Sequence, residues 1–228
     1  MDDNSISLNK FISETGICSR RVADEWIELG RVTLNDVIAK KGNRVFENDI
    51  VKIDSTILKK KPELVYLAFN KPPGITCTTD LKDKDNIIEF INYPKRIFPI
   101  GRLDKASTGL IILTNDGDIV NQILRVENNH EKEYVVSVNK PITPEFILKM
   151  SNGIPILGTK TNKCVVKRIN ANTFNIILTQ GLNRQIRRMC EFLNYKVVTL
   201  KRVRIMNIKI DGIKEGQWRY LDKKEINL

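Results

Sequence analysis

The sequence predicts an α+β protein with two domains. Beyond residue 64, apolar runs of strand length predominate and their connections vary, which favours a mainly antiparallel sheet with flanking helices over βαβ repetition. The first fifty-odd residues instead show two short helix patterns followed by short strands. Residues 54–64 carry no apolar period and contain the string Lys59-Lys60-Lys61-Pro62, so they read as a linker. We therefore assign residues 1–61 to a small α/β domain with its linker and residues 62–228 to a larger domain.

The elements of the small domain follow from capping and turn residues. Serines open two helices and glycines close them: Ser7 precedes residues 8–14 and Gly16, and Ser19 precedes residues 20–29 and Gly30. Short apolar runs at residues 32–37 and 50–53, broken by Asn-Asp turns, predict strands. The domain should thus pair two helices with a small sheet.

In the larger domain, hydrophobic periodicity separates strands from helices. Strands are expected at residues 65–69, 110–113, 134–138, 164–167, 174–178 and 197–205. Helices are expected at residues 86–91, 118–124, 144–150 and 184–193, the last one capped by Asn183. Asn194 stands at the end of that helix, and Asn tolerates the left-handed backbone of a helix stop.

Charge is strongly segregated along the chain. The net charge is +11, and residues 160–209 hold 12 cations against the single acid Glu191. Such segregation predicts a polyanionic partner, with nucleic acid as the default. The four cysteines form no Cys-x-x-Cys pair, which argues against a zinc site or a disulfide framework. Without an apolar stretch of membrane-spanning length or a secretory signal, we expect a cytoplasmic protein with no membrane association.

Asp104 is the first candidate for chemistry. It lies in the polar string Gly101-Arg102-Leu103-Asp104-Lys105-Ala106-Ser107-Thr108-Gly109-Leu110, at the mouth of an apolar strand and beside an arginine. By itself, an Asp in a glycine-bounded loop most often bonds its own backbone as a turn or cap. The remaining sequence offers one histidine and no paired carboxylate, metal cluster or phosphate loop.

The ten-residue string is more specific than the lone carboxylate. It resembles the signature of the pseudouridine synthases in the branch typified by RsuA. Three further strings resemble motifs of that family: Asn70-Lys71-Pro72-Pro73-Gly74, His130-Glu131-Lys132-Glu133-Tyr134 and residues 180–190. The resemblance implies that Asp104 is catalytic, that Tyr134 packs against the target uracil and that Arg187 pairs with Asp104. It also makes Lys71 a substrate-contacting cation.

The less specific alternatives remain open at each of these positions. A tyrosine at the start of a strand is commonly a core residue, although stacking a flipped base on Tyr134 would contribute roughly 1–3 kcal/mol. Arg184 and Arg188, beside Arg187, contact either phosphates or solvent. Arg102 either enters the stack where the base left or makes a structural contact. Arg202 and Arg204, within the basic segment, are expected to contact phosphates.

The small domain resembles the S-four-type RNA-binding domain first recognised in a small-subunit ribosomal protein. The matching strings are residues 8–11, 16–21, 30–32 and 45–53. The resemblance implies RNA contacts for Lys10, Arg20, Arg21 and Arg31. Charge alone does not indicate them, because residues 1–61 hold 11 cations and 10 acids.

The motifs together predict a monomeric RNA pseudouridine synthase that needs no metal or other cofactor. Its expected substrate is a uridine of large-subunit ribosomal RNA, with a tRNA uridine as a further possible target. Asp104 would act as a nucleophile or as a base toward the sugar, two roles that the residues do not separate. The main alternative is a non-catalytic RNA-binding or ribosome-assembly factor. A glycosidase is disfavoured because the sequence lacks a second carboxylate at a suitable position. A deaminase is disfavoured because the sequence lacks the His-x-Glu and Pro-Cys-x-x-Cys strings.

Overall fold

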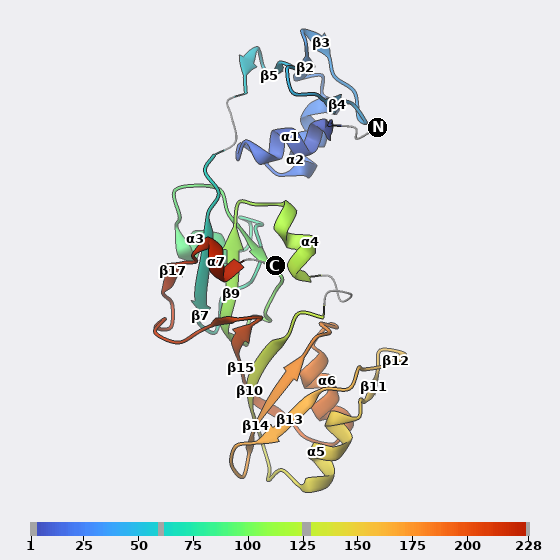
Figure 1. Cartoon of the computed structure of the whole chain (residues 1–228), viewed down its shortest axis with the longest axis vertical. Helices are drawn as coiled ribbons and strands as arrows, with labels where there is room; N and C mark the ends of the chain where they lie inside the picture. The colour runs from blue at the N-terminus through green and yellow to red at the C-terminus, as the bar shows by residue number, and fades with distance from the viewer. Residues whose placement is uncertain (1–3, 59–61, 125–128, 227–228) are drawn as a thin grey trace. The chain divides into compact units, whose positions relative to one another are not determined.

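The computed structural model describes residues 4–58, 62–124 and 129–226, and it divides into two compact units (Figure 1). Residues 1–64 with 94–96 form the first unit, and residues 65–93 with 97–228 form the second. This division falls three residues after the boundary that the sequence predicts at residue 61. Residues 59–61, the basic part of the predicted linker, lie outside the described residues.

The first unit contains the helix pair and small sheet that its sequence predicts. Helices α1 (Leu8–Glu14) and α2 (Arg20–Glu28) pack on each other. The sheet has the order β3 (Val37–Ile38), β2 (Val32–Leu34), β5 (Val51–Ile53) and β6 (Thr56–Ile57), and β1 (Ile6–Ser7) pairs with β4 (Arg44–Val45). Ser19 accepts from the Val22 N–H and so caps α2, as predicted. Ser7 holds the predicted cap position of α1 but makes no side-chain capping hydrogen bond. The position of the cap is therefore confirmed, and the capping bond is not.

The second unit is built on one mixed sheet that is almost wholly antiparallel. Its order is β13 (Val165–Arg168), β14 (Thr173–Leu178), β10 (Lys132–Val138), β15 (Val197–Ile205), β9 (Thr108–Thr114), β7 (Tyr66–Lys71) and β17 (Trp218–Tyr220). Two short strands join it, β16 (Ile208–Lys209) on β15 and β8 (Phe98–Ile100) on β9. A separate hairpin pairs β11 (Pro155–Ile156) with β12 (Thr159–Lys160). The α+β prediction is therefore confirmed.

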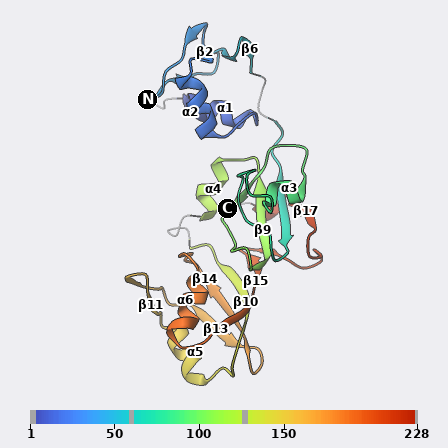
Figure 2. The ribbon, with the colours of Figure 1, turned by 180° about the vertical axis from the view of Figure 1, so that it is seen from behind.

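Helices cover the sheet in two places (Figures 1 and 2). Helices α5 (Pro144–Ser151) and α6 (Gln185–Phe192) pack on β10, β13 and β14, where Phe146 and Met189 meet Phe174 in one core. Helices α3 (Ile87–Ile91) and α4 (Asp118–Leu124) lie by β7 and β9, and α7 (Lys223–Ile226) ends the described chain. Both faces of β9 are buried, which explains its uninterrupted run of apolar residues.

The two halves of the sheet join where β9 and β15 run parallel. Arg202 faces Gly109 across this short pair, and the carbonyl oxygen of Arg202 would lie 2.2 Å from a Cβ atom at position 109. Gly109 also has a φ of +103°, which side chains rarely adopt. Glycine is thus required both by space and by backbone conformation, five residues after Asp104.

Candidate active site

The loop that carries Asp104 joins β8 to β9 and is held from inside by Lys71. The Lys71 ammonium is fully buried and donates to the carbonyls of Pro72 at 2.8 Å, Lys105 at 3.2 Å and Ser107 at 2.8 Å. Desolvation by burial lowers its pKa, although the negative charge of Asp104 partly opposes this effect. The expectation that Lys71 contacts substrate is corrected, because its ammonium donates to two carbonyls of the loop and to that of Pro72, and none of the side chain is exposed.

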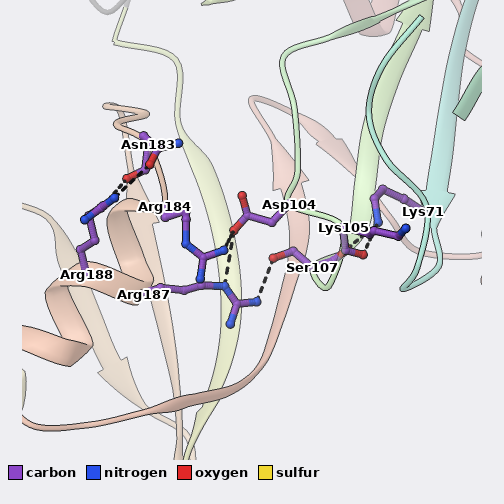
Figure 3. Close-up of polar contacts among 8 residues, drawn as sticks. All are labelled: Lys71, Asp104, Lys105, Ser107, Asn183, Arg184, Arg187 and Arg188. Carbon is purple, nitrogen blue, oxygen red and sulfur yellow. Dashed lines mark hydrogen bonds and ion pairs between the residues drawn. The ribbon is translucent and has the colours of Figure 1, made fainter. Parts of the chain in front are cut away.

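The Asp104 carboxylate lies against two arginines of the α6 region (Figure 3). Its Oδ2 is 3.3 Å from Arg184 Nη1 and 3.4 Å from Arg187 Nε. Arg187 also donates from Nη2 to Ser107 Oγ at 3.1 Å, so it binds the loop at two points. No hydrogen bond or ion pair of Asp104 Oδ1 is found among the described residues. One oxygen is therefore held by cations while the other remains available for reaction.

The three arginines near the start of α6 have different partners. Arg187 lies beside Asp104, as the resemblance implied, whereas Arg184 joins it there instead of contacting only phosphate or solvent. Arg188 donates to the backbone and side-chain oxygens of Asn183, at 3.1 and 3.2 Å. The helix begins at Gln185 with Arg184 in the cap position, so the predicted Asn183 cap is wrong. Arg184 has a φ of +50°, a strained backbone of the kind that clusters at functional sites.

Two adjoining cavities open beside Asp104. Their volumes are about 90 and 820 Å³, and both are lined by Asp104, Tyr134, Arg102 and Arg184. Tyr134 is half-buried on β10 and packs against the cores on both sides of the site. The larger cavity lies within the range that holds a nucleotide-sized ligand. Arg102 is exposed at its rim, a position compatible with either of its expected roles.

Two arginines that were expected to contact phosphates have partners within the protein. Arg202 is 3% exposed and donates from Nε to the Leu110 carbonyl at 2.6 Å. Arg204 pairs with Glu133 at 2.6 Å and Glu131 at 2.9 Å. The expectation of a surface phosphate contact is corrected for Arg204, because its guanidinium serves a carboxylate network instead. Arg202 is buried beside the cavity instead of lying on the surface.

The Arg204 network should make stability depend on pH. The hydrogen bond from Arg204 lowers the pKa of Glu133, so this contact stabilises the fold above the unfolded-state pKa of Glu133 and is lost as the pH falls through the folded-state value. We expect Arg204→Met to lower the free energy of unfolding by about 1–3 kcal/mol at pH 7, with the difference shrinking as the pH falls through the lowered pKa of Glu133. Urea unfolding across pH measures it, and Lys201→Met is an exposed control on the same strand. A constant difference from pH 7 to pH 3 would contradict this account.

The candidate RNA contacts of the first unit differ in their surroundings. Arg31 pairs with Asp54 and lies over the Trp26 ring at 5.0 Å. Lys10 lies 3.5 Å from Glu14. Arg20 and Arg21 are exposed at the start of α2. RNA binding by all four residues stays a prediction.

Sequence reasoning missed the residues that support Asp104. Ser107, a residue of the loop itself, accepts from Arg187, and Cys77 Sγ accepts from the Leu103 N–H of the loop at 3.4 Å. Ser107 occupies the Ser/Thr position of the ten-residue string, which could have indicated a role. Cys77 had no sequence signal, because an isolated cysteine usually reads as a small core residue.

Arg187 is expected to contribute more to the rate than its neighbour Arg188. Arg187→Gln removes an ionic contact to Asp104 Oδ2, and we expect the rate to fall about 100- to 1,000-fold, a loss similar to that from removing one oxyanion-hole donor. Arg188→Gln is the matched control, because Arg188 binds Asn183 instead. Single-turnover rates at saturating RNA compare the two, with thermal melting to check the fold. A normal rate for Arg187→Gln would move the pairing role to Arg184.

Comparisons with known proteins agree with this architecture. Residues 65–192 match the RNA pseudouridylate synthase family, and residues 7–51 match the S4 domain. Dual-specificity RNA pseudouridine synthase RluF of Escherichia coli (strain K12) is 55% identical over 99% of this chain and 79% of its own length. Ribosomal large subunit pseudouridine synthase B of Bacillus subtilis (strain 168) is 32% identical over 96% of this chain and 93% of its own. A crystal structure of a pseudouridylate synthase superposes with a TM-score of 0.71 at 29% identity, covering 97% of this chain and 98% of the other.

The chain belongs to the RNA pseudouridylate synthase family, in the RsuA branch with an N-terminal S4 domain. It is an RNA-modifying isomerase, and the non-catalytic alternative is disfavoured. The strings around residues 130–134, 154–158 and 180–190 resemble RluF in particular, a likeness that the 55% identity confirms. Within the described residues, no helix is long and apolar enough to cross a membrane, and no group of three or more potential metal-ligating side chains is found.

Proposed function

We propose that the protein converts a uridine of large-subunit ribosomal RNA into pseudouridine, acting as a monomer in the cytoplasm and without a cofactor. The observation that carries the proposal is the Asp104 carboxylate, held through one oxygen by two arginines at the wall of a cavity that Tyr134 also lines. The 55% sequence identity with RluF supports the choice of substrate. A tRNA uridine is a second proposed target, since that relative is named dual-specificity.

The reaction needs few groups from the protein. The bond between N1 of uracil and C1′ of the ribose breaks, the uracil rotates, C5 bonds to C1′, and the C5 proton leaves to solvent while N1 gains one. We propose that Asp104 Oδ1 attacks C1′ or takes a proton from the ribose, while Arg184 and Arg187 hold Oδ2. Tyr134 offers a flat face that keeps the detached uracil in the cavity.

Pseudouridine mapping tests this function directly. Ribosomal RNA and tRNA from a strain lacking the gene should lose one large-subunit site, and a tRNA site as well if the second target holds. The wild-type gene should restore them and the Asp104→Asn gene should not. Loss of a site only in small-subunit RNA would overturn the proposed substrate and leave the isomerase assignment intact.

We also propose that the S4 domain selects the RNA. Its boundary with the catalytic domain is proposed to lie between residues 61 and 65. A chain of residues 65–228 is expected to fold and to retain Asp104 chemistry, but with RNA affinity reduced by about tenfold or more because phosphate contacts are lost. Melting temperature and single-turnover kinetics measure the two effects separately. A truncated chain that melts far below the full-length protein would show that the units share a core.

A further inference from the structure

The face of the sheet beside Asp104 carries two cations, Lys132 and Arg202. They are distinct from the arginines of helix α6. Lys132 and Tyr134 are two residues apart on β10, so their side chains share a face. Arg202 lies opposite Tyr134 on β15 and therefore shares that face too. All three residues line the cavity of about 820 Å³ together with Asp104.

The Arg202 guanidinium is buried, and one of its nitrogens lacks an acceptor among the described residues. Its Nε donates to the Leu110 carbonyl, but Nη2 is buried and has no partner among the described residues. Leaving a buried donor unsatisfied costs about 1–3 kcal/mol, and more for a charged group. Arg202 lines the cavity from the strand junction at Gly109. A buried, incompletely paired cation at the wall of a cavity favours an anionic ligand.

Lys132 adds a second charge that has no carboxylate partner among the described residues. Its ammonium donates to the His130 carbonyl at 3.2 Å, and burial together with the nearby Arg202 lowers its pKa. The carboxylates lining the cavity have other partners: Asp80 and Asp83 accept backbone N–H groups at 3.0 Å, and Asp104 is held by α6. Within the described part of the chain, no carboxylate forms an ion pair with Lys132 or Arg202. Two like charges sharing a cavity repel each other, and an anion between them would relieve that repulsion.

We propose that Lys132 and Arg202 form an anion site that binds a phosphodiester group flanking the target uridine. This inference rests on the proposed function, because it assigns a subsite for the same RNA. It also meets a need of the reaction, in which the sugar-phosphate backbone must stay fixed while the uracil rotates against Tyr134. Arg202 serves in addition as a positioning residue, since its backbone lies between those of Tyr134 and Gly109.

A double-mutant cycle between protein and RNA tests the site. The RNA is a large-subunit fragment that the wild-type protein modifies, made with one neutral methylphosphonate at each flanking phosphate in turn. The protein variant is Lys132→Gln, and Lys214→Gln is an exposed control that removes one charge outside the cavity lining. Single-turnover kmax/K1/2 is measured for every pairing, and the salt dependence of affinity is measured for the unmodified RNA.

We expect Lys132→Gln to lower kmax/K1/2 about tenfold on unmodified RNA, as for loss of a charge-assisted hydrogen bond. On RNA with the one critical methylphosphonate, the same variant should lose less than about threefold, and its salt slope should fall by about one. Arg202→Lys should show the same coupling if it folds. If the Arg202→Lys variant melts well below the wild-type protein, the coupling measured with Lys132→Gln still tests the anion site.

If the losses of kmax/K1/2 from Lys132→Gln and from the methylphosphonate add at every phosphate, the anion site is overturned and the proposed function stands. A wild-type protein that modifies no large-subunit fragment would overturn the proposed function and this inference together.

Discussion

Asp104→Asn is expected to abolish pseudouridine formation while leaving RNA binding nearly intact. The change removes the negative charge and the nucleophilic or basic oxygen, but it keeps the shape of the side chain. We expect the single-turnover rate to fall about a thousandfold or more, with RNA affinity within about tenfold of wild type. Release of tritium from C5-labelled uridine in RNA measures the reaction, because the C5 hydrogen is lost only when the new bond forms.

The control for this variant is Asp211→Asn, which neutralises an exposed aspartate outside the cavity lining. It should release tritium at the wild-type rate. Two outcomes count against the assignment of Asp104. Retained turnover would remove it from the chemistry, and a parallel loss of folding would show that the ion pairs with Arg184 and Arg187 serve stability instead.

Gly109→Ala is expected to have the largest effect on stability. A methyl group at this position would lie 2.2 Å from the Arg202 carbonyl oxygen and 2.7 Å from the Arg202 nitrogen, and both are backbone atoms. Because the parallel β9–β15 pair cannot move apart without opening the sheet, we expect the free energy of unfolding to fall by about 3–5 kcal/mol, the sum of steric clash and a positive φ. Urea denaturation measures it.

Two other glycines separate the causes. Gly74 has a φ of +87° with nothing within 4 Å of an added Cβ, so Gly74→Ala reports the backbone cost alone, about 1–2 kcal/mol. Gly117 has neither a positive φ nor a neighbour within 4 Å, so Gly117→Ala should not destabilise the protein. A Gly109→Ala variant no less stable than Gly74→Ala would show that the β9–β15 approach is relaxed in solution.

Local sequence patterns predicted most elements of the second unit. Strand β15 spans Val197–Ile205 and α4 spans Asp118–Leu124, the ranges that periodicity indicates. Asn194 adopts the expected left-handed backbone, with a φ of +63°. Such features depend on neighbouring residues along the chain, so the chain itself carries the information.

Pairing between distant segments was not predictable in the same way. No local pattern indicates that β9 runs parallel to β15, about 90 residues later, in a sheet that is otherwise antiparallel. The Arg184 contact with Asp104 joins residues 80 positions apart. The predicted Asn183 cap failed because Arg184 takes the cap position in a strained backbone that brings it to the catalytic loop.

By itself, the sequence determined the fold class, the family and the identity of Asp104, Tyr134 and Arg187 as candidates, because a ten-residue string and helix or strand periods are local properties. Only the tertiary structure decided which cations face the cavity. Lys71, Arg202 and Arg204 resemble surface charges in the sequence, yet each is bound by carbonyls or carboxylates from other segments. Burial of a charge depends on what packs over it, and those neighbours are assembled only when the strands pair.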